Sequence, residues 1–245
     1  MDSIFKIAID AALKAGERIL EIYHQDFEVD FKQDDSPLTI ADTSAHKIIT
    51  SFLTETKFPI LSEEGDAINY ENRKNWKQFW LVDPLDGTKE FVKKNGEFTV
   101  NIALIEDGIP VFGVVFAPVI HKLYYGGTTV KPHLIHKEVI IPLKPANTNT
   151  AQYIVASKSH LNKETQDFIN QYPDYGTISM GSSLKFMLLA EQKASLYPRI
   201  APTMEWDTGA AHGVLKSLNY SVCDLQGNEL IYNKENLLNP FFIAK

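Results

Sequence analysis

The sequence has little cysteine and no long apolar run, and each shortage excludes a class of protein. Its 245 residues include one cysteine, Cys223, so no disulfide can form within the chain, and such a chain suits a reducing compartment. No window reaches the roughly 18 apolar residues of a membrane-spanning helix, and residues 1–20 lack the basic start and apolar stretch of a secretion signal. We therefore expect a cytoplasmic protein with no transmembrane segment; peripheral attachment to the cytoplasmic face of the inner membrane is the one membrane role left open.

Positive charge is also scarce. Lys and Arg number 24 against 31 Asp and Glu, which gives a formal net charge of −7. A surface that binds nucleic-acid backbone needs clustered basic residues in excess, so we expect no nucleic-acid partner. An anionic ligand would need a local device to hold it, and a bound divalent cation is one, because it can reverse the electrostatics of its site.

The first part of the chain predicts helices followed by strands that end in acidic residues. Residues 3–23 carry apolar side chains at three- and four-residue steps, which predicts a helix lying on a core. A second helix is expected from about residue 43 to residue 54, with Asp42 capping its N-terminal end. The apolar runs 58–61 and 79–82 predict buried strands. Both lead into acidic residues, and strand ends are where α/β proteins place their sites.

The middle of the chain predicts a β-meander, and the last part predicts alternating strands and helices. Residues 97–106 and 109–117 are β-rich runs separated by Asp107-Gly108, a strong hairpin signal, and 122–125 extend the meander. The alternating segments are strands 152–157, 176–181 and 194–199 and helices 162–170, 183–191 and 208–217. The fold class is therefore α/β (α+β), with an N-terminal α+β half, 1–130, and a C-terminal α/β half, 131–245.

The motif Asp83-Pro84-Leu85-Asp86-Gly87-Thr88 carries the clearest chemical signal. Two carboxylates stand three residues apart across a turn that follows a strand, so both can be aimed at one point. Mg²⁺ prefers such oxygen ligands at about 2.0–2.1 Å, with water and phosphate completing its octahedron. Gly87 and Thr88 also offer backbone N–H groups to an anion. An Asp-rich turn that caps its own backbone is the alternative reading of the motif alone.

Two further acidic segments are weaker when read by themselves. Ser62-Glu63-Glu64-Gly65-Asp66 follows a predicted strand, and three acidic residues on a loop can equally be a solvated surface. Asp207 precedes an apolar helix in N-cap position, where it can be a simple cap. Spacing alone does not decide which of Glu63 and Glu64 binds metal.

Four segments in order make a family resemblance visible. Residues 62–64 (SEE), 83–91 (DPLDGTKEF), 181–186 (GSSLKF) and 197–208 (YPRIAPTMEWDT) resemble the 3′(2′),5′-bisphosphate nucleotidases of the CysQ type, within the lithium-sensitive inositol monophosphatase superfamily. The resemblance implies a layered α-β-α-β-α sandwich of the sugar-phosphatase type. One departure is Gly209, which precedes two alanines where the family has the glycine after them.

The resemblance also implies a role for each matching residue. The implied metal ligands, for two or three Mg²⁺ ions, are the carboxylates of Glu63, Asp83, Asp86 and Asp207 and the carbonyl of Leu85. The implied catalytic pair, which orients and deprotonates the attacking water, is Asp42 and Thr88. The implied substrate contacts are Gly87, Thr88, His160, Ser182, Lys185, Arg199 and Asp207. The alignment favours Glu63 over Glu64 as the ligand.

The implied function is Mg²⁺-dependent hydrolysis of a small nucleotide in sulfur metabolism. The expected substrate is 3′-phosphoadenosine 5′-phosphate, which yields AMP; 3′-phosphoadenylyl sulfate is a further candidate. A broad inositol-phosphate or sugar-phosphate phosphatase is the alternative enzyme, and a non-catalytic nucleotide or metal sensor is an alternative of another class. A monomer and a homodimer both remain open.

Overall fold

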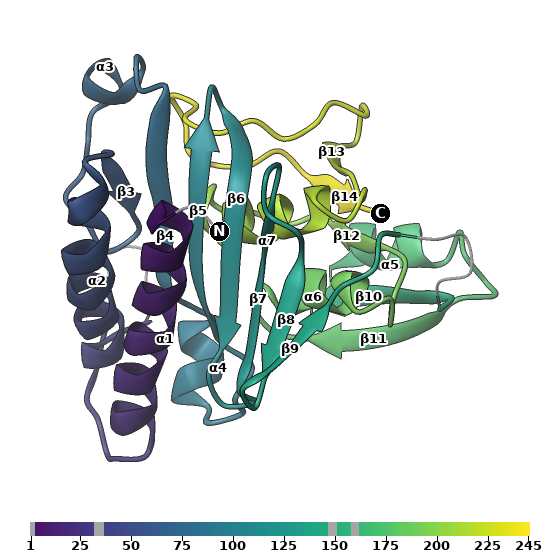
Figure 1. Cartoon of the computed structure of the whole chain (residues 1–245). Helices are drawn as coiled ribbons and strands as arrows, with labels where there is room; N and C mark the ends of the chain where they lie inside the picture. The colour runs from purple at the N-terminus through teal and green to yellow at the C-terminus, as the bar shows by residue number, and fades with distance from the viewer. Residues whose placement is uncertain (1–2, 32–36, 147–150, 158–161) are drawn as a thin grey trace.

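The computed structural model describes residues 3–31, 37–146, 151–157 and 162–245. Helices and sheets alternate in five layers (Figure 1), which confirms the predicted α-β-α-β-α sandwich. The helices, in layer order, are α1 (Ser3–Tyr23) and α2 (Ile40–Leu53), then α6 (Leu184–Ala190) and α7 (Trp206–Lys216), then α5 (Lys163–Ile169). The predicted first helix is confirmed.

A seven-stranded sheet forms the second layer and runs in the order β3-β4-β5-β6-β7-β8-β9. Its strands are β3 (Ile60–Ser62), β4 (Gln78–Asp86), β5 (Thr99–Glu106), β6 (Ile109–Ala117), β7 (Lys122–Gly127), β8 (His133–His136) and β9 (Val139–Pro142). Only β3 and β4 pair in parallel; the other neighbours are antiparallel. The predicted hairpin is confirmed, because Asp107 and Gly108 both have the positive φ that a tight β-turn needs.

The sheet continues beyond the predicted meander. Strands β8 and β9 were not predicted, and they carry the sheet past residue 130, the predicted boundary between the two halves. Whether those halves behave as separate domains stays a prediction.

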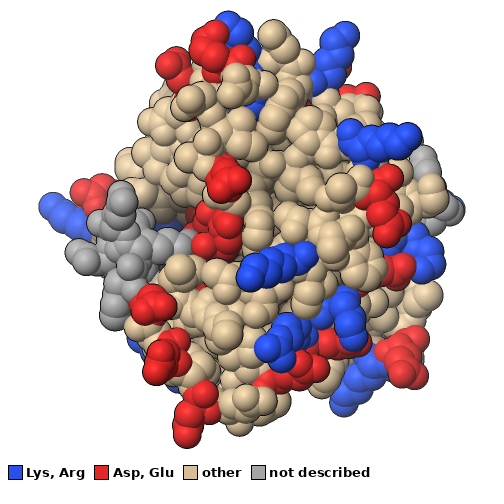
Figure 2. Space-filling model, turned by 90° about the vertical axis from the view of Figure 1, so that its left-hand side faces the viewer, with Lys and Arg blue, Asp and Glu red and all other residues tan. Residues whose placement is uncertain are grey.

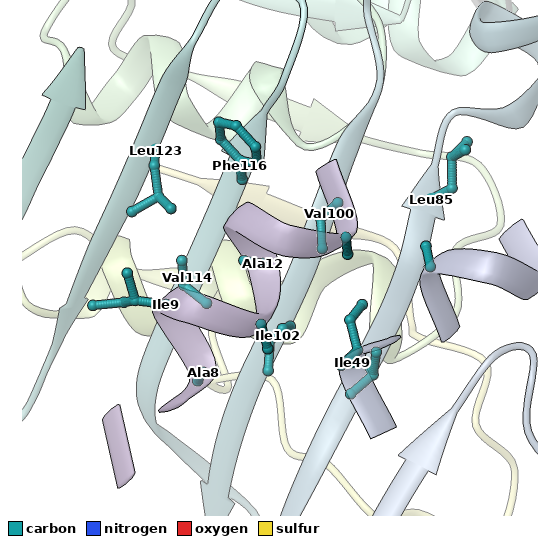
Figure 3. Packing of buried hydrophobic residues seen from close by; sticks show 14 of the residues in the cluster. Ala8, Ile9, Ala12, Ile49, Leu85, Val100, Ile102, Val114, Phe116 and Leu123 are labelled. Carbon is teal, nitrogen blue, oxygen red and sulfur yellow. The ribbon is translucent and has the colours of Figure 1, made fainter. Parts of the chain in front are cut away.

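Both faces of this sheet are buried, and this follows from the apolar runs in its strands. On β4, Trp80 and Val82 face the α1 and α2 side, whereas Phe79 and Leu81 face the α6 and α7 side. Figure 3 shows small side chains of α1, among them Ala8 and Ala12, lying over the strands. Alanines at helical spacing let the α1 backbone come close to the sheet.

Helix α7 packs unusually close to the opposite face. A Cβ added to Gly113 of β6 would lie 1.9 Å from the Ala210 carbonyl oxygen. One added to Gly209 would lie 2.8 Å from Cδ2 of Leu81 on β4. The glycine that departs from the family pattern therefore stands where helix and sheet nearly touch, and this close packing fixes the start of α7 against β4.

The outer layers are built from two small sheets and α5. Strand β10 (Tyr153–Ser157) pairs in parallel with β11 (Gly176–Met180), and β14 (Phe242–Ala244) lies between β12 (Tyr197–Arg199) and β13 (Val222–Asp224). The predicted alternation is confirmed, with the last strand shortened to three residues; β14 was not predicted. The remaining elements are β1 (Val29–Phe31), β2 (Pro37–Thr39), a 3-10 turn (Thr54–Thr56), α3 (Tyr70–Arg73) and α4 (Thr88–Val92).

The surface carries both signs of charge. On the face drawn in Figure 2, lysine and arginine side chains are interspersed with aspartate and glutamate. No described helix has the length and apolar character required to cross a membrane.

The close approach of α7 to the sheet leads to a testable prediction about stability. Gly113→Ala is expected to lower the free energy of unfolding by about 3 kcal/mol, because the new methyl group would overlap the α7 backbone. Urea unfolding in EDTA measures this. Gly227→Ala is the matched control, since its Cβ would meet nothing within 4 Å and only its positive φ of 89° adds strain, at a cost of about 1 kcal/mol. An equal or smaller loss for Gly113→Ala would contradict the prediction.

Candidate active site

The central motif is a bulged strand end and not a turn after a strand, which corrects the prediction. Strand β4 runs through Asp86, and its pairing with β5 shifts from Asp83↔Asn101 to Asp86↔Thr99. Three steps on β4 thus match two on β5, which is a β-bulge, a device that re-aims side chains at a strand end. Gly87 follows with φ of 92°, a conformation that suits glycine, and turns the chain into α4.

Three carboxylates meet beside this bulge. Side-chain oxygens of Glu63, Asp83 and Asp207 lie within 4.8 Å of one another. Glu63 extends the parallel pairing of β3, because its N–H donates to the Val82 carbonyl at 3.1 Å. The structure therefore gathers three of the four predicted carboxylate ligands into one cluster.

The electrostatics of this cluster call for a cation. Asp83 is 1% exposed; burial raises its pKa well above the usual value, and the negative charge of Glu63, followed by that of Asp86, raises it further. Burial likewise raises the pKa of Asp207, with Asp86 and Glu63 adding to the effect. Carboxylates that repel each other in a buried cluster are stabilised by a hard divalent cation. The donor set thus fits Mg²⁺.

Asp207 lies inside the first turn of α7 and not at its N-cap, which corrects the prediction. The helix starts at Trp206, after Glu205. Asp207 Oδ2 accepts a hydrogen bond from the Met204 N–H at 2.8 Å. This bond fixes one carboxylate oxygen within its own turn while the side chain lines the cavity.

Asp86, the fourth predicted carboxylate, lies beside the three-membered cluster. It lines the same cavity, and Ser182, predicted to contact the substrate, donates its hydroxyl to Asp86 Oδ2 at 2.9 Å. The structure thus joins the motif on β4 to the residue 181–186 segment.

Asp42 and Thr88 come together as predicted, from segments far apart in the chain. The Thr88 hydroxyl donates to Asp42 Oδ1 at 3.0 Å and lies 3.3 Å from the Leu85 carbonyl. Asp42 Oδ2 accepts from both the N–H and the hydroxyl of Thr39, at 2.8 and 2.7 Å. Burial raises the pKa of Asp42, and the bonds from Thr39 and Thr88 oppose this rise.

The helix that carries Asp42 starts earlier than predicted. Its cap is Thr39, which accepts from the Ala41 N–H at 3.1 Å, and Asp42 is the reciprocal partner in a capping box. Asp42 is therefore an internal residue of the first turn. Its Oδ2 accepts hydrogen bonds from the cap residue Thr39, and its Oδ1 accepts from Thr88.

The three carboxylates and the basic side chains of Lys185 and Arg199 line one cavity of about 470 Å³. Lys185 is 7% exposed and donates to the Ser182 carbonyl at 2.6 Å. Burial lowers its pKa to about 8, although Asp86 opposes this shift. Arg199 donates through Nη2 to the Pro202 carbonyl at 2.9 Å, and its buried Nε has no hydrogen-bond partner among the described residues. This guanidinium retains a donor for an anion.

Not every predicted residue can be placed, and some residues of the site were not predicted. His160 lies outside the described residues. Thr39, Asn101 and Ser183 hold the predicted carboxylates and were assigned no role. Asn101 had one usable signal, a polar side chain inside the apolar run of β5; Ser183 stood in the GSSLKF segment, but its contacts depend on tertiary structure.

Known proteins resemble this chain in sequence and in fold. The model of the inositol monophosphatase family matches residues 1–240. The 3′(2′),5′-bisphosphate nucleotidase CysQ of Salmonella typhimurium is 45% identical over 239 residues, which cover 94% of this chain and 95% of that protein. The crystal structure of CysQ from Bacteroides thetaiotaomicron matches with a TM-score of 0.89 and 45% identity, over 98% of this chain and 96% of that one. The suhB protein of Bartonella henselae, at 22% identity, has a TM-score of 0.81 over 99% of this chain and 93% of that one, and shows the fold alone.

The repulsion among the buried carboxylates leads to a prediction of how the stability of the fold responds to metal and to pH. Because the pKa values of Asp83 and Asp207 are raised in the folded state, the folded chain binds more protons than the unfolded chain. In EDTA, stability should therefore fall as pH rises from about 4, the unfolded value, through the higher folded values. Excess Mg²⁺ should reverse this loss. Urea unfolding at several pH values measures both effects.

A substitution tests the same repulsion. Asp83→Asn is expected to raise the free energy of unfolding in EDTA near neutral pH, because it removes one of the mutually repelling charges, and to abolish the stabilisation by Mg²⁺. Asp167→Asn, at an exposed position, is the control and should change neither. Destabilisation of the metal-free Asp83→Asn variant would show that repulsion does not dominate at this position.

Proposed function

Because this chain belongs to the inositol monophosphatase family, we propose that its cavity removes the 3′-phosphate from 3′-phosphoadenosine 5′-phosphate, giving AMP and inorganic phosphate. One observation carries the proposal. A single cavity is lined by the carboxylates Glu63, Asp83 and Asp207 and by the cations of Lys185 and Arg199. A substrate with two phosphates matches these two kinds of group, because one phosphate can meet metal and the other can meet the basic side chains.

The name of the similar proteins supports the nucleotide as substrate. The Salmonella and Bacteroides proteins, both called CysQ, match this chain over nearly its whole length. We propose 3′-phosphoadenylyl sulfate as a second substrate, since it carries the same 3′-phosphate. A cytoplasmic setting belongs to the same proposal.

The proposed metal ligands are Glu63, Asp83, Asp86, Asp207 and the Leu85 carbonyl, which would hold two or three Mg²⁺ ions. When bound, Mg²⁺ lowers the pKa of a coordinated water and neutralises charge on the phosphate and on the leaving oxygen. Hydrogen bonds from the backbone fix two of these carboxylates in place. Asp83 is fixed by the Leu85 N–H, which donates to its Oδ1 at 3.0 Å, and Asp207 by the Met204 N–H.

Thr88 and Asp42 are proposed to orient the attacking water and take its proton. The Thr88 hydroxyl donates to Asp42 Oδ1, so its oxygen keeps lone pairs that can accept a hydrogen bond from water. As the water attacks phosphorus, the bond between phosphorus and the ribose 3′ oxygen breaks, and the departing oxygen takes a proton from solvent. The proton of the attacking water moves to Thr88 Oγ1 while the Thr88 proton moves to Asp42 Oδ1. Burial raises the pKa of Asp42 and so favours its taking this proton, while the hydrogen bonds from Thr39 keep its other oxygen in place.

Lys185 and Arg199 are proposed to bind the 5′-phosphate. Arg199 offers a planar fork of donors, one of which is unpaired among the described residues, whereas Lys185 acts as a point charge. The backbone N–H of Gly87, the backbone of Ser182 and the side chain of His160 complete the proposed substrate contacts. Ser182 contributes through its backbone in this proposal, because its hydroxyl is donated to Asp86.

Phosphate release tests the proposal directly. The protein with Mg²⁺ is expected to release phosphate from 3′-phosphoadenosine 5′-phosphate at least ~10-fold faster than from inositol 1-phosphate at equal concentration, and EDTA should stop the reaction. Faster release from the inositol ester would instead support a broad inositol-phosphate phosphatase. Release from neither, with tight binding of the nucleotide, would support a non-catalytic sensor.

A second test distinguishes the role of the basic side chains in the cavity from that of the carboxylates. Arg199→Met is expected to raise KM for 3′-phosphoadenosine 5′-phosphate by about 10- to 100-fold, the effect of losing a charge-assisted hydrogen bond, and to leave hydrolysis of p-nitrophenyl phosphate within about 3-fold. Lys193→Met removes an exposed cation outside this cavity and serves as control. An unchanged KM in Arg199→Met would remove Arg199 from the substrate site.

A further inference from the structure

Every donor found for Asp86 points to one of its two carboxylate oxygens. Oδ2 accepts hydrogen bonds from the Ser183 N–H at 2.7 Å, the Ser183 hydroxyl at 2.8 Å and the Ser182 hydroxyl at 2.9 Å, and Asn101 Nδ2 lies 3.4 Å away. Among the described residues, no donor is recorded on Oδ1. A carboxylate oxygen has about two lone-pair directions, so Oδ2 is saturated and Oδ1 is the oxygen left to face a cation.

Ser183 contributes more to this arrangement than its neighbours. It supplies both a backbone N–H and a hydroxyl to Asp86, and its hydroxyl also lies 3.0 Å from the carbonyl of Asp207. One serine thus contacts the carboxylate at the end of β4 and the backbone of the helix that carries another carboxylate. The relative position of Asp86 and Asp207 depends on it.

Asn101 fixes the direction of the Ser183 hydroxyl. Its Nδ2 donates to Ser183 Oγ at 2.9 Å, which leaves the hydroxyl proton for Asp86 or for the Asp207 carbonyl. The Asn101 Oδ1 in turn accepts from Thr99 at 3.2 Å. Asn101 and Ser183 are each 1% exposed and Thr99 is fully buried, so water has little access to these groups and they depend on one another for hydrogen bonds.

The backbone at this point is strained, which indicates that the arrangement is enforced by its surroundings. Ser182 has φ of 54°, a left-handed conformation that costs a non-glycine residue about 1–2 kcal/mol. This conformation presents the hydroxyls of both serines and the Ser183 N–H to one carboxylate oxygen. Strain at a ligand-binding turn is retained where the geometry serves the site.

We infer that Ser183 is a positioning residue for the metal centre: with Asn101 behind it, Ser183 holds Oδ2 of Asp86 so that Oδ1 is presented to a Mg²⁺ ion beside Asp207. This inference rests on the proposed metal site but not on the identity of the substrate. Residues that orient metal ligands in this way commonly change metal affinity by 10- to 100-fold when they are substituted.

Titration calorimetry of Mg²⁺ into the metal-stripped full chain, without substrate, tests the inference. Ser183→Ala is expected to raise the Mg²⁺ dissociation constant by about 10-fold or more and to raise the Mg²⁺ concentration for half-maximal hydrolysis by a similar factor. The turnover rate at saturating Mg²⁺ should recover to within about 3-fold of the original protein. Ser217→Ala is the matched control, because its hydroxyl donates to the Val214 carbonyl at 2.6 Å at the far end of α7.

Two further variants keep the test decisive if Ser183→Ala folds poorly. Ser183→Thr retains the hydroxyl and should bind Mg²⁺ within about 3-fold of the original protein, whereas Asn101→Ala should weaken binding in the same direction as Ser183→Ala. The double variant should lose little more than the worse single one, since both residues act through one oxygen. A Mg²⁺ affinity that is unchanged in Ser183→Ala and in Asn101→Ala overturns the inference.

The outcomes also separate this inference from the proposed function. A protein that binds Mg²⁺ but hydrolyses no nucleotide would overturn the function and leave the role of Ser183 standing if the affinities shift as expected. A protein that hydrolyses the nucleotide with unshifted affinities in the variants would overturn only the positioning role. Lower stability in EDTA without a change in Mg²⁺ affinity would show a merely structural serine.

Discussion

Mutual repulsion among buried carboxylates is the constraint that the rest of this structure serves. Glu63, Asp83 and Asp207 come from three separate elements, yet their oxygens lie within 4.8 Å of one another. Left free, such groups would move apart or take up protons. They stay together because each is fixed by the chain around it: Glu63 by parallel pairing with β4, Asp83 by its bulge, and Asp207 by its own helical turn. The surrounding chain therefore holds the carboxylates together despite their repulsion, and a bound cation would reduce that repulsion.

The large sheet is the common reference for these elements, and this explains its burial on both faces. On one side α1 and α2 set Asp42 against Thr88; on the other, α7 lies so close to β6 that only glycine fits at residue 113. A helix held at that distance cannot slide without breaking backbone contacts. The position of Asp207 relative to β4 is consequently a property of helix-on-sheet packing, and the small residues of α7 matter to the site as much as its acids do.

Local patterns in the sequence predicted the features of the structure that depend on local interactions. The amphipathic repeat predicted α1, Asp107-Gly108 predicted the hairpin, and the acidic motifs predicted the carboxylates that meet in the cavity. Errors arose where tertiary contacts override local signals. Polar residues at Asp83–Asp86 read as a turn because a bulge has no local signature, and α2 starts at Ile40 because its cap bonds with Asp42. Ser183 and Asn101 could not be assigned, since their partners lie on other elements.

The gathering of the site from distant parts of the chain has a kinetic consequence. The carboxylate cluster begins on the parallel β3–β4 pair. It is complete only when α7, from near the end of the sequence, has docked on the same sheet. Contacts between residues so far apart in sequence form slowly, because the closure of long loops must precede them. A partly folded chain would therefore offer only fragments of the chelating set. The proposed Mg²⁺ site would therefore form late in folding, so the ion would stabilise the completed fold and would not nucleate it.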